Sequence, residues 1–424
     1  MARRYKKWLI ALTFSAAPAA IAMADPLSPE VSKLDEERLE PGLYPAAPGS
    51  DVYAPTEPYH PPFRIDWSLG LKGTYTSSSS NGGSFATTLN PQFSAVHEGV
   101  RTDFSANGAA EISKSWRGEG PIEVPSLRLG VETSTLLGPN TRLHGEGALA
   151  VNRELLSAPG PDPNIIETPI SVTGSAGIGV EQSFGRFNMR VDGDVARTLY
   201  GDTNRLDTGI TPNTSRNVWE AGATLRLGYQ VTPIFEVFGE AGMSRDIFDV
   251  ASPSLGVKTD ATGRTLRGGV TGTWDERITA TASIGVGHHD FDAAGLTDIT
   301  TQLYDASVTY RPNKTVDVTA KLATNIVPTG SDTPGTAKVE HTASVGVGYR
   351  VNSWLRLRGS ADWSKSSLEG TGETEHRNGF GTGADYVLNA NTALSADYAF
   401  DHRDNSNSGV TDTHRVSLGV TLRR

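Results

Sequence analysis

Alternation of apolar and polar residues over long segments constrains this chain more than any other feature. From Trp219 onward, one set of positions holds Trp219, Ala221, Ala223, Leu225, Leu227 and Tyr229, and the set between them holds Glu220, Gly222, Thr224, Arg226 and Gly228. Segments that begin at Val316, Val339 and Leu355 repeat this alternation. Because successive side chains of a β-strand point to opposite faces, each segment predicts a strand with one apolar and one polar face.

The length of these segments favours a transmembrane antiparallel β-barrel over a soluble β-sandwich, which shows the same alternation. The segments run to about 10–14 residues, whereas strands of globular proteins have about 5–6. A tilted strand needs about 9–11 residues to cross a bilayer. Only helices and closed barrels pair every backbone polar group in lipid, so if this chain, which has no long apolar segment in its body, meets a membrane, it must cross it as a barrel.

Aromatic residues gather at one end of the predicted strands, next to short turns. The residues of this predicted aromatic girdle are Tyr229, Trp274, Tyr310, Tyr349, Trp354 and Tyr386. Short turns such as Val351-Asn352 alternate with longer connections such as 200–215. Interfacial aromatic girdles, short periplasmic turns and long outer loops are typical of outer-membrane barrels.

Nine hairpins fit between Ile65 and Arg424, which predicts an all-β barrel of about 18 strands with both termini on the periplasmic side. A count of 16 is the alternative, because the segments before Ser171 alternate less regularly. Turns beginning at Tyr310, Tyr349 and Tyr386 recur at intervals of 39 and 37 residues. A period near 40 also occurs in β-propellers, but a propeller blade has four short strands and this period holds two long ones.

The chain before the barrel divides into two predicted segments. Residues 1–24 have four basic residues, an apolar run and the sequence Ala22-Met23-Ala24 before Asp25, which predicts a cleaved secretory signal peptide. A membrane anchor is the alternative, although Pro18 and the short run disfavour it. Residues 25–63 are rich in proline and acidic residues and predict an extended periplasmic arm. The barrel is expected to occupy residues 64–424.

Composition excludes several classes of function. The formal net charge is −10, so the chain lacks the basic excess that nucleic-acid binding needs. There are no cysteines, which excludes disulfides, thiolate metal sites and thiol nucleophiles. We therefore expect neither a nucleic-acid partner nor a cofactor.

The turn Tyr310-Arg311-Pro312-Asn313, the related turns at 349–352 and 386–389, and the entry from Tyr53 to Arg64 resemble the β-barrel porin families of proteobacterial outer membranes. The resemblance covers roughly residues 50–424. It implies a Gram-negative outer-membrane location, with outer-membrane lipid, lipopolysaccharide and the barrel-assembly machinery as partners. The segment from Thr413 resembles the C-terminal recognition strand of such barrels, but Arg424 stands where most members have an aromatic residue.

The polar strand faces supply candidate lumen-lining residues, 11 acidic and six basic. They are Arg190, Asp192, Asp194, Glu220, Arg226, Glu236, Glu240, Arg267, Asp305, Asp317, Lys321, Glu340, Arg356, Arg358, Asp362, Asp385 and Asp397. An acidic excess predicts a mild preference for cations. Two alternatives stay open: the charges pair across strands and only keep the interior wet, or Arg226, Arg267, Arg356 and Arg358 cluster into a basic ladder for anions.

Catalytic motifs are weak. There is no Gly-x-Ser-x-Gly elbow and no P-loop, and His97-Glu98 lacks the second histidine of a zinc-protease motif. The best candidate is the run from His288 to Asp292 at an outer strand end, to which neighbouring strands would add Asp401 and His402. Metal binding by Asp246, Asp249 and Asp260 is a similarly weak prediction. We expect no enzyme activity, no catalytic residue and no metal.

These observations predict an outer-membrane diffusion channel for small hydrophilic solutes. One alternative is a closed or gated barrel that acts as scaffold or export partner for envelope polysaccharide. Another is a surface hydrolase at the barrel rim.

Overall fold

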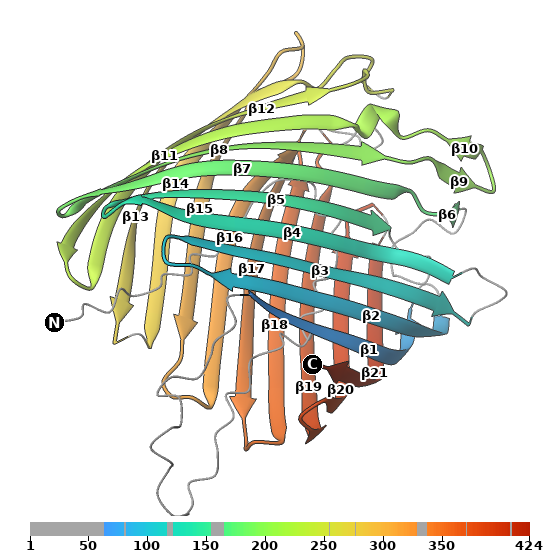
Figure 1. Cartoon of the computed structure of the whole chain (residues 1–424). Helices are drawn as coiled ribbons and strands as arrows, with labels where there is room; N and C mark the ends of the chain where they lie inside the picture. The colour runs from blue at the N-terminus through green and yellow to red at the C-terminus, as the bar shows by residue number, and fades with distance from the viewer. Residues whose placement is uncertain are drawn as a thin grey trace, which may run out of the picture.

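The computed structural model describes residues 63–424 except 80–81, 117–121, 154–164, 254, 276, 329–336, 370 and 408. The described residues form one closed antiparallel β-barrel (Figure 1). The predicted signal peptide and nearly all of the predicted arm lie outside them. In the described part of the chain, no helix is long and apolar enough to cross a membrane.

Eighteen long strands form the barrel wall. The first nine are β1 (Phe63–Ser78), β2 (Gly82–Glu98), β3 (Thr102–Ser115), β4 (Ile122–Gly138), β5 (Thr141–Arg153), β7 (Ile170–Phe184), β8 (Phe187–Tyr200), β11 (Val218–Thr232) and β12 (Phe235–Phe248). The remaining nine are β13 (Ala261–Trp274), β14 (Ile278–Phe291), β15 (Ile299–Tyr310), β16 (Val316–Pro328), β17 (Ala337–Arg350), β18 (Leu355–Leu368), β19 (Thr374–Asn389), β20 (Thr392–Asn405) and β21 (Gly409–Arg423). The predicted 18-stranded barrel is confirmed, and the alternative count of 16 is wrong.

Each long strand pairs with the long strands before and after it in the chain, and β1 pairs with β21 to close the ring. At this closure Trp67 and Arg424 exchange two backbone hydrogen bonds, with N–O distances of 3.2 and 3.0 Å. In Figure 1 the blue β1 and the dark red β21 lie side by side. The ring is therefore closed at this junction, and closure is the condition for a sheet in lipid.

The two ends of the barrel differ. Short connections such as the one at Gly185, which has a φ of +64°, join strands at one end, which we call the turn end. Most of the longer connections lie at the other end, which we call the loop end; one of them, between β8 and β11, contains β9 (Thr203–Arg205), β10 (Gly209–Thr211) and the 3-10 helix η1 (Thr214–Arg216). β9 pairs with β10 and with β6 (Ile165–Glu167) in a separate small sheet. Both ends of the described chain lie at the turn end.

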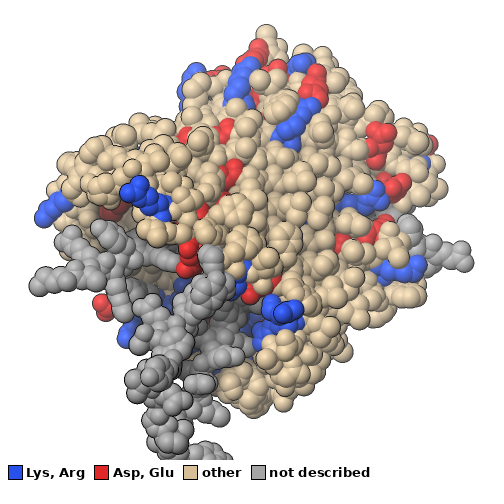
Figure 2. Space-filling model, in the orientation of Figure 1, with Lys and Arg blue, Asp and Glu red and all other residues tan. Residues whose placement is uncertain are grey.

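The alternating pattern separates the two faces of the wall. On β11, Leu225 and Leu227 are 40% and 54% exposed, whereas Arg226 between them is half-buried. Much of the wall in Figure 2 is tan, without Lys, Arg, Asp or Glu. Polar side chains of the other face meet across an intervening strand: His144 on β5 lies 2.6 Å from Asp192 on β8, beyond β7. Contacts of this reach occur on the concave side, so the polar face lines the interior.

Backbone pairing stops early between β15 and β16. These strands pair through six residue pairs, from Asp305 with Ala323 to Tyr310 with Val318, and not beyond them toward the loop end. There Ile299, Ala337 and Val339 form a buried apolar cluster, with Phe291 and Ile326 packed against it. Side-chain packing thus replaces backbone pairing at this seam.

We expect charge to be tolerated on one face of β11 and not on the other. Leu225→Lys places an ammonium in the apolar band and should lower the free energy of unfolding in lipid vesicles by about 2–4 kcal/mol. The adjacent Thr224→Lys, on the interior face, should cost less than about 1 kcal/mol. Urea titration of vesicle-inserted protein measures both values, and equal costs would contradict the assignment of the faces.

Candidate functional site

The predicted lumen-lining residues lie on the strand face opposite the exposed apolar side chains. All of them except Lys321 are buried or half-buried. The structure brings several of them together in ion pairs across strands, and these pairs include partners that the sequence did not indicate. That they line an open channel stays a prediction.

A deeply buried ion-pair cluster centres on Arg358 of β18. Its Nη2 donates to Asp385 Oδ1 on β19 and to Asp397 Oδ1 on β20, both at 2.8 Å. Lys72 Nζ of β1 lies 3.8 Å from Asp397 Oδ2. A Cβ at Gly383 would lie 2.3 Å from Asp397 Oδ1, so a larger residue there would displace the carboxylate. Burial makes this cluster dependent on its pairing, because a lone charge would be left without water.

Further ion pairs continue from this cluster toward the loop end. Arg377 Nε donates to Asp401 Oδ2 at 2.6 Å, and Arg403 Nη2 donates to Glu375 Oε2 at 2.7 Å. These four residues lie on β19 and β20 and were absent from the predicted lumen-lining residues. The same period-two alternation places these residues on the polar face. Glycines at alternate positions of β19 made that alternation difficult to recognise.

A second set of interior charges lies on β5, β8, β11 and β12. Asp192 accepts from Arg190 Nε at 2.7 Å and lies 2.6 Å from His144 Nε2. Arg226 Nη2 donates to Glu236 Oε1 at 3.2 Å, and the Arg226 guanidinium lies 3.5 Å from the ring centroid of Phe238. Guanidinium stacking on a ring fixes its plane, so Arg226 is held by both charge and packing.

The alternative of a basic ladder, which required Arg226, Arg267, Arg356 and Arg358 to cluster, is not observed. Arg356 and Arg358 lie on β18, whereas Arg226 lies on β11 and Arg267 on β13, and neither of these strands neighbours β18. Arg358 and Arg226 are moreover paired with carboxylates. The alternative of cross-strand pairing is therefore observed for much of the interior.

The six girdle residues lie at the turn end and are exposed, with side chains in the outward set. Trp354 and Tyr386 have ring centroids 5.2 Å apart, and Phe187 lies 4.9 Å from Tyr229. Amphipathic rings at this level are suited to a membrane–water interface.

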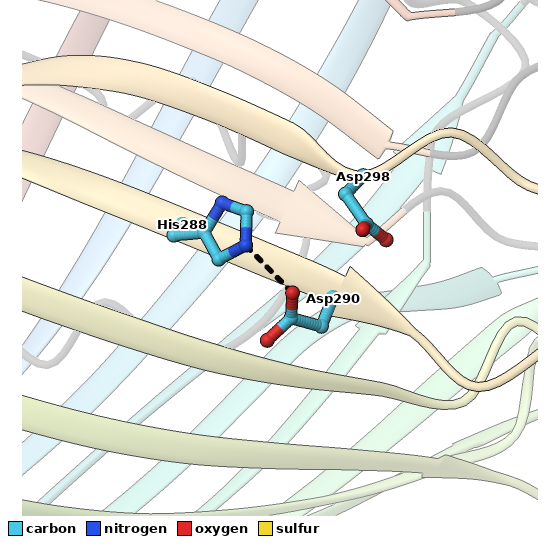
Figure 3. Close-up of side chains that lie close together, drawn as sticks. All are labelled: His288, Asp290 and Asp298. Carbon is cyan, nitrogen blue, oxygen red and sulfur yellow. Dashed lines mark ion pairs between the residues drawn. The ribbon is translucent and has the colours of Figure 1, made fainter.

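The histidine run at the rim divides between the two faces, as the strand period predicts. His288 points outward (Figure 3): its Nε2 lies 2.6 Å from Asp290 Oδ1, and its Nδ1 lies 2.8 Å from Thr300 Oγ1. His289 is on the interior face, where Nε2 lies 3.5 Å from Asp246 Oδ2. The expectation that neighbouring strands add Asp401 and His402 is wrong, because these residues lie on β20 and β14 pairs with β13 and β15.

Among the described residues, His288, Asp290 and Asp298 form the group whose ligand atoms all lie within 4.8 Å. Arg264 Nη1 lies 2.9 Å from Asp290 Oδ2, so a cation already occupies one side of this group. Asp298 accepts from the backbone N–H of Phe291. These contacts account for the three side chains without a metal.

The acidic residues Asp246, Asp249 and Asp260 have separate partners. Asp249 accepts from Arg197, which holds the pKa of its carboxyl below the ordinary value, and Asp260 Oδ1 accepts from the backbone N–H of Phe248. In the same way, Arg245 hydrogen-bonds to Asp292 and lowers the pKa of that carboxyl. Arg197 and Arg245 belong to the outward set, so these pairs fasten strands together at the loop end.

Residues 64–424 match the model of a protein family described as Putative beta-barrel porin 2. Among solved structures, the FrpB iron transporter from Neisseria meningitidis is 9% identical with a TM-score of 0.44, over 80% of this chain and 63% of that protein. The siderophore receptor PirA from Pseudomonas aeruginosa is 10% identical with a TM-score of 0.43, over 86% and 81%. OccK3 (OpdO) from the same organism is 14% identical with a TM-score of 0.42, over 85% and 96%.

The chain thus spans less than two thirds of the length of the iron transporter. No curated protein matches the sequence. The family is accordingly given by the match over residues 64–424, which covers the whole barrel.

Removing the charge at the centre of the buried cluster should destabilise the barrel. Arg358→Gln leaves Asp385 and Asp397 without their shared guanidinium, and we expect a loss of about 3–5 kcal/mol in the free energy of unfolding. The exposed Lys321→Gln serves as the control and should change it by less than about 0.5 kcal/mol. Similar values for the two variants would show that the cluster contributes no stability.

The outward ion pair between Arg245 and Asp292 at the loop end should stabilise the protein in a pH-dependent way. The folded pKa of Asp292 is lowered by Arg245, so the stabilisation is complete above the unfolded pKa of about 3.9 and is lost as the pH falls through the folded pKa. Melting temperatures of wild type and Arg245→Gln should differ at pH 6 and converge below pH 3. A difference that persists at the lowest pH would argue against the ion pair as its cause.

Proposed function

Because the chain belongs to the family described as Putative beta-barrel porin 2, we propose that its outer-membrane barrel is a channel through which small hydrophilic solutes diffuse. The observation that carries the proposal is a closed ring of 18 strands with a charged interior face. Barrels of about 16–18 strands are wide enough to enclose an aqueous passage. A channel needs no catalytic group, and the histidine run at the rim is divided between two faces.

In this proposal the turn end faces the periplasm and the loop end faces the exterior. Residues 1–24 are removed on export, and residues 25–63 extend from the turn end into the periplasm. Outer-membrane lipid surrounds the exposed apolar band, and lipopolysaccharide surrounds the loop end. The barrel-assembly machinery would insert the chain, with the segment from Thr413 as its recognition element.

Solute passage would be filtered by size and charge. The interior face carries more acidic than basic candidates, and a wall with an excess of one sign concentrates the opposite ion. Ion pairs such as Arg358 with Asp397 cancel part of that excess, so the expected preference for cations is modest. Carboxylates that lack such partners would contribute most to it.

Conductance in a planar bilayer tests the channel. We expect the refolded protein to give discrete conductance steps and a reversal potential that favours K⁺ over Cl⁻ in a KCl gradient. The preference should weaken between 0.01 M and 1 M salt, where the Debye length falls from about 30 Å to about 3 Å.

A variant that lacks residues 25–63 separates diffusion from a scaffold role in polysaccharide export. Unchanged conductance without the arm would support diffusion through the barrel alone. Insertion without any conductance, in both the full chain and the shortened chain, would reject the channel and favour the scaffold.

A further inference from the structure

Four titratable side chains lie together on the interior face near the loop end, separate from the cluster around Arg358. They are Asp194 on β8, Glu220 on β11, Asp246 on β12 and His289 on β14. Glu220 and Asp246 are directly opposite each other in the β11–β12 register, and Asp194 is opposite Gly222, two residues along β11. We call this group the carboxylate cluster.

Two glycines give the cluster its shape. A Cβ at Gly222 would lie 2.7 Å from Asp194 Oδ1, so the carboxylate occupies the space that a side chain would fill. A Cβ at Gly263 would lie 3.4 Å from His289 Nδ1, and the His289 ring passes over this position on β13. The ring thereby crosses from β14 to bring its Nε2 within 3.5 Å of Asp246 Oδ2 on β12.

Buried polar atoms in the cluster lack partners within the described residues. The His289 side chain is only 6% exposed, and its Nε2 has no hydrogen-bond partner there. Glu220 Oε2 is likewise buried and without one. Glu220 Oε2 is a buried acceptor without a donor, and His289 Nε2 is one as well when the imidazole proton lies on Nδ1, so both atoms favour a ligand that brings an N–H group.

The charge of Arg245 acts on Asp246 through space, but among the described residues no lysine or arginine is ion-paired with the three carboxylates. Within the described chain, Asp194, Glu220 and Asp246 form no ion pair with a lysine or arginine. Arg245, next to Asp246 in the chain, belongs to the outward set and binds Asp292, and the Arg216 guanidinium stacks on Tyr200. By contrast, the neighbouring Asp192 binds Arg190. The cluster thus concentrates negative charge that a bound cation would balance.

We propose that the carboxylate cluster binds the primary ammonium group of a cationic solute. This inference rests on the proposed channel and names a class of solute for it. An ammonium group has three N–H donors, which suits carboxylate oxygens together with a neutral imidazole nitrogen. A bare metal ion fits less well, because metal ligands must converge closely, and among the described residues it is His288, Asp290 and Asp298 that do so within 4.8 Å.

Isothermal titration of the full chain in detergent micelles at pH 8 tests the site, with n-butylammonium as the probe. Tetramethylammonium, which has the same charge but no N–H, and Mg²⁺ are the comparison ligands. We expect n-butylammonium to bind at least ten times more tightly than tetramethylammonium. Equal affinity for n-butylammonium and tetramethylammonium, or tighter binding of Mg²⁺, would overturn the proposal.

Variants locate the site. Glu220→Gln combined with Asp246→Asn should weaken n-butylammonium binding at least tenfold, and His289→Phe should weaken it several-fold. Glu236→Gln, on the same interior face near the turn end, should leave the affinity within twofold. Circular dichroism and heat-dependent gel mobility establish that each variant is folded, and unchanged affinity in the folded double variant would reject the site.

Bilayer recordings distinguish failure of this inference from failure of the channel. A protein that conducts but binds n-butylammonium no better than tetramethylammonium keeps the channel and loses the ammonium site. A protein that inserts and never conducts loses the channel, and with it the role of the cluster in solute passage. Reduction of single-channel current by n-butylammonium in wild type, but not in the double variant, would support both.

Discussion

The backbone of a membrane-spanning sheet must pair all of its N–H and C=O groups within the sheet, and this requirement determines the rest of the structure. Lipid offers no hydrogen bonds to a free strand edge, so the sheet has to close on itself. Here the closure is made by β1 and β21, with Trp67 and Arg424 in reciprocal backbone hydrogen bonds. Once the ring is closed, every side chain is committed to the lipid face or to the interior face by its position along the strand.

The assignment of charged side chains to the interior face explains why the interior holds many ion pairs. On the concave side, side chains from strands two places apart approach each other, as Arg358 of β18 and Asp397 of β20 do across β19. Charges in a partly desolvated interior are stabilised by such partners. Where partners are missing, as around Glu220, the same geometry concentrates charge of one sign, and selectivity would arise from these exceptions.

The strands, the turns and the girdle could be predicted from the sequence because each depends on local order. Alternation assigned Leu225 and Arg226 to opposite faces, and the turn at Asn352 was recognisable from its residues. The pairing of interior charges could not be predicted, since it depends on register between strands and on room left by glycines. Gly383 beside Asp397 and Gly222 beside Asp194 are examples.

Strand neighbourhood was the second source of error. Asp401 was expected beside His288, yet five strands separate β14 from β20 in the ring, because sequential hairpins place each strand next to its predecessor. Asp246 was grouped with Asp249 and Asp260 as a metal ligand, although it belongs to β12 and lies opposite Glu220. Extending the alternation past Ser244 would have revealed it.

Because the first strand of the barrel pairs with the last, the barrel cannot close if either strand is missing. A chain without β21 would leave one edge of β1 and one edge of β20 unpaired. Each edge would carry backbone N–H and C=O groups that lipid cannot solvate. Closure of the barrel therefore depends on the pairing of β21 with β1.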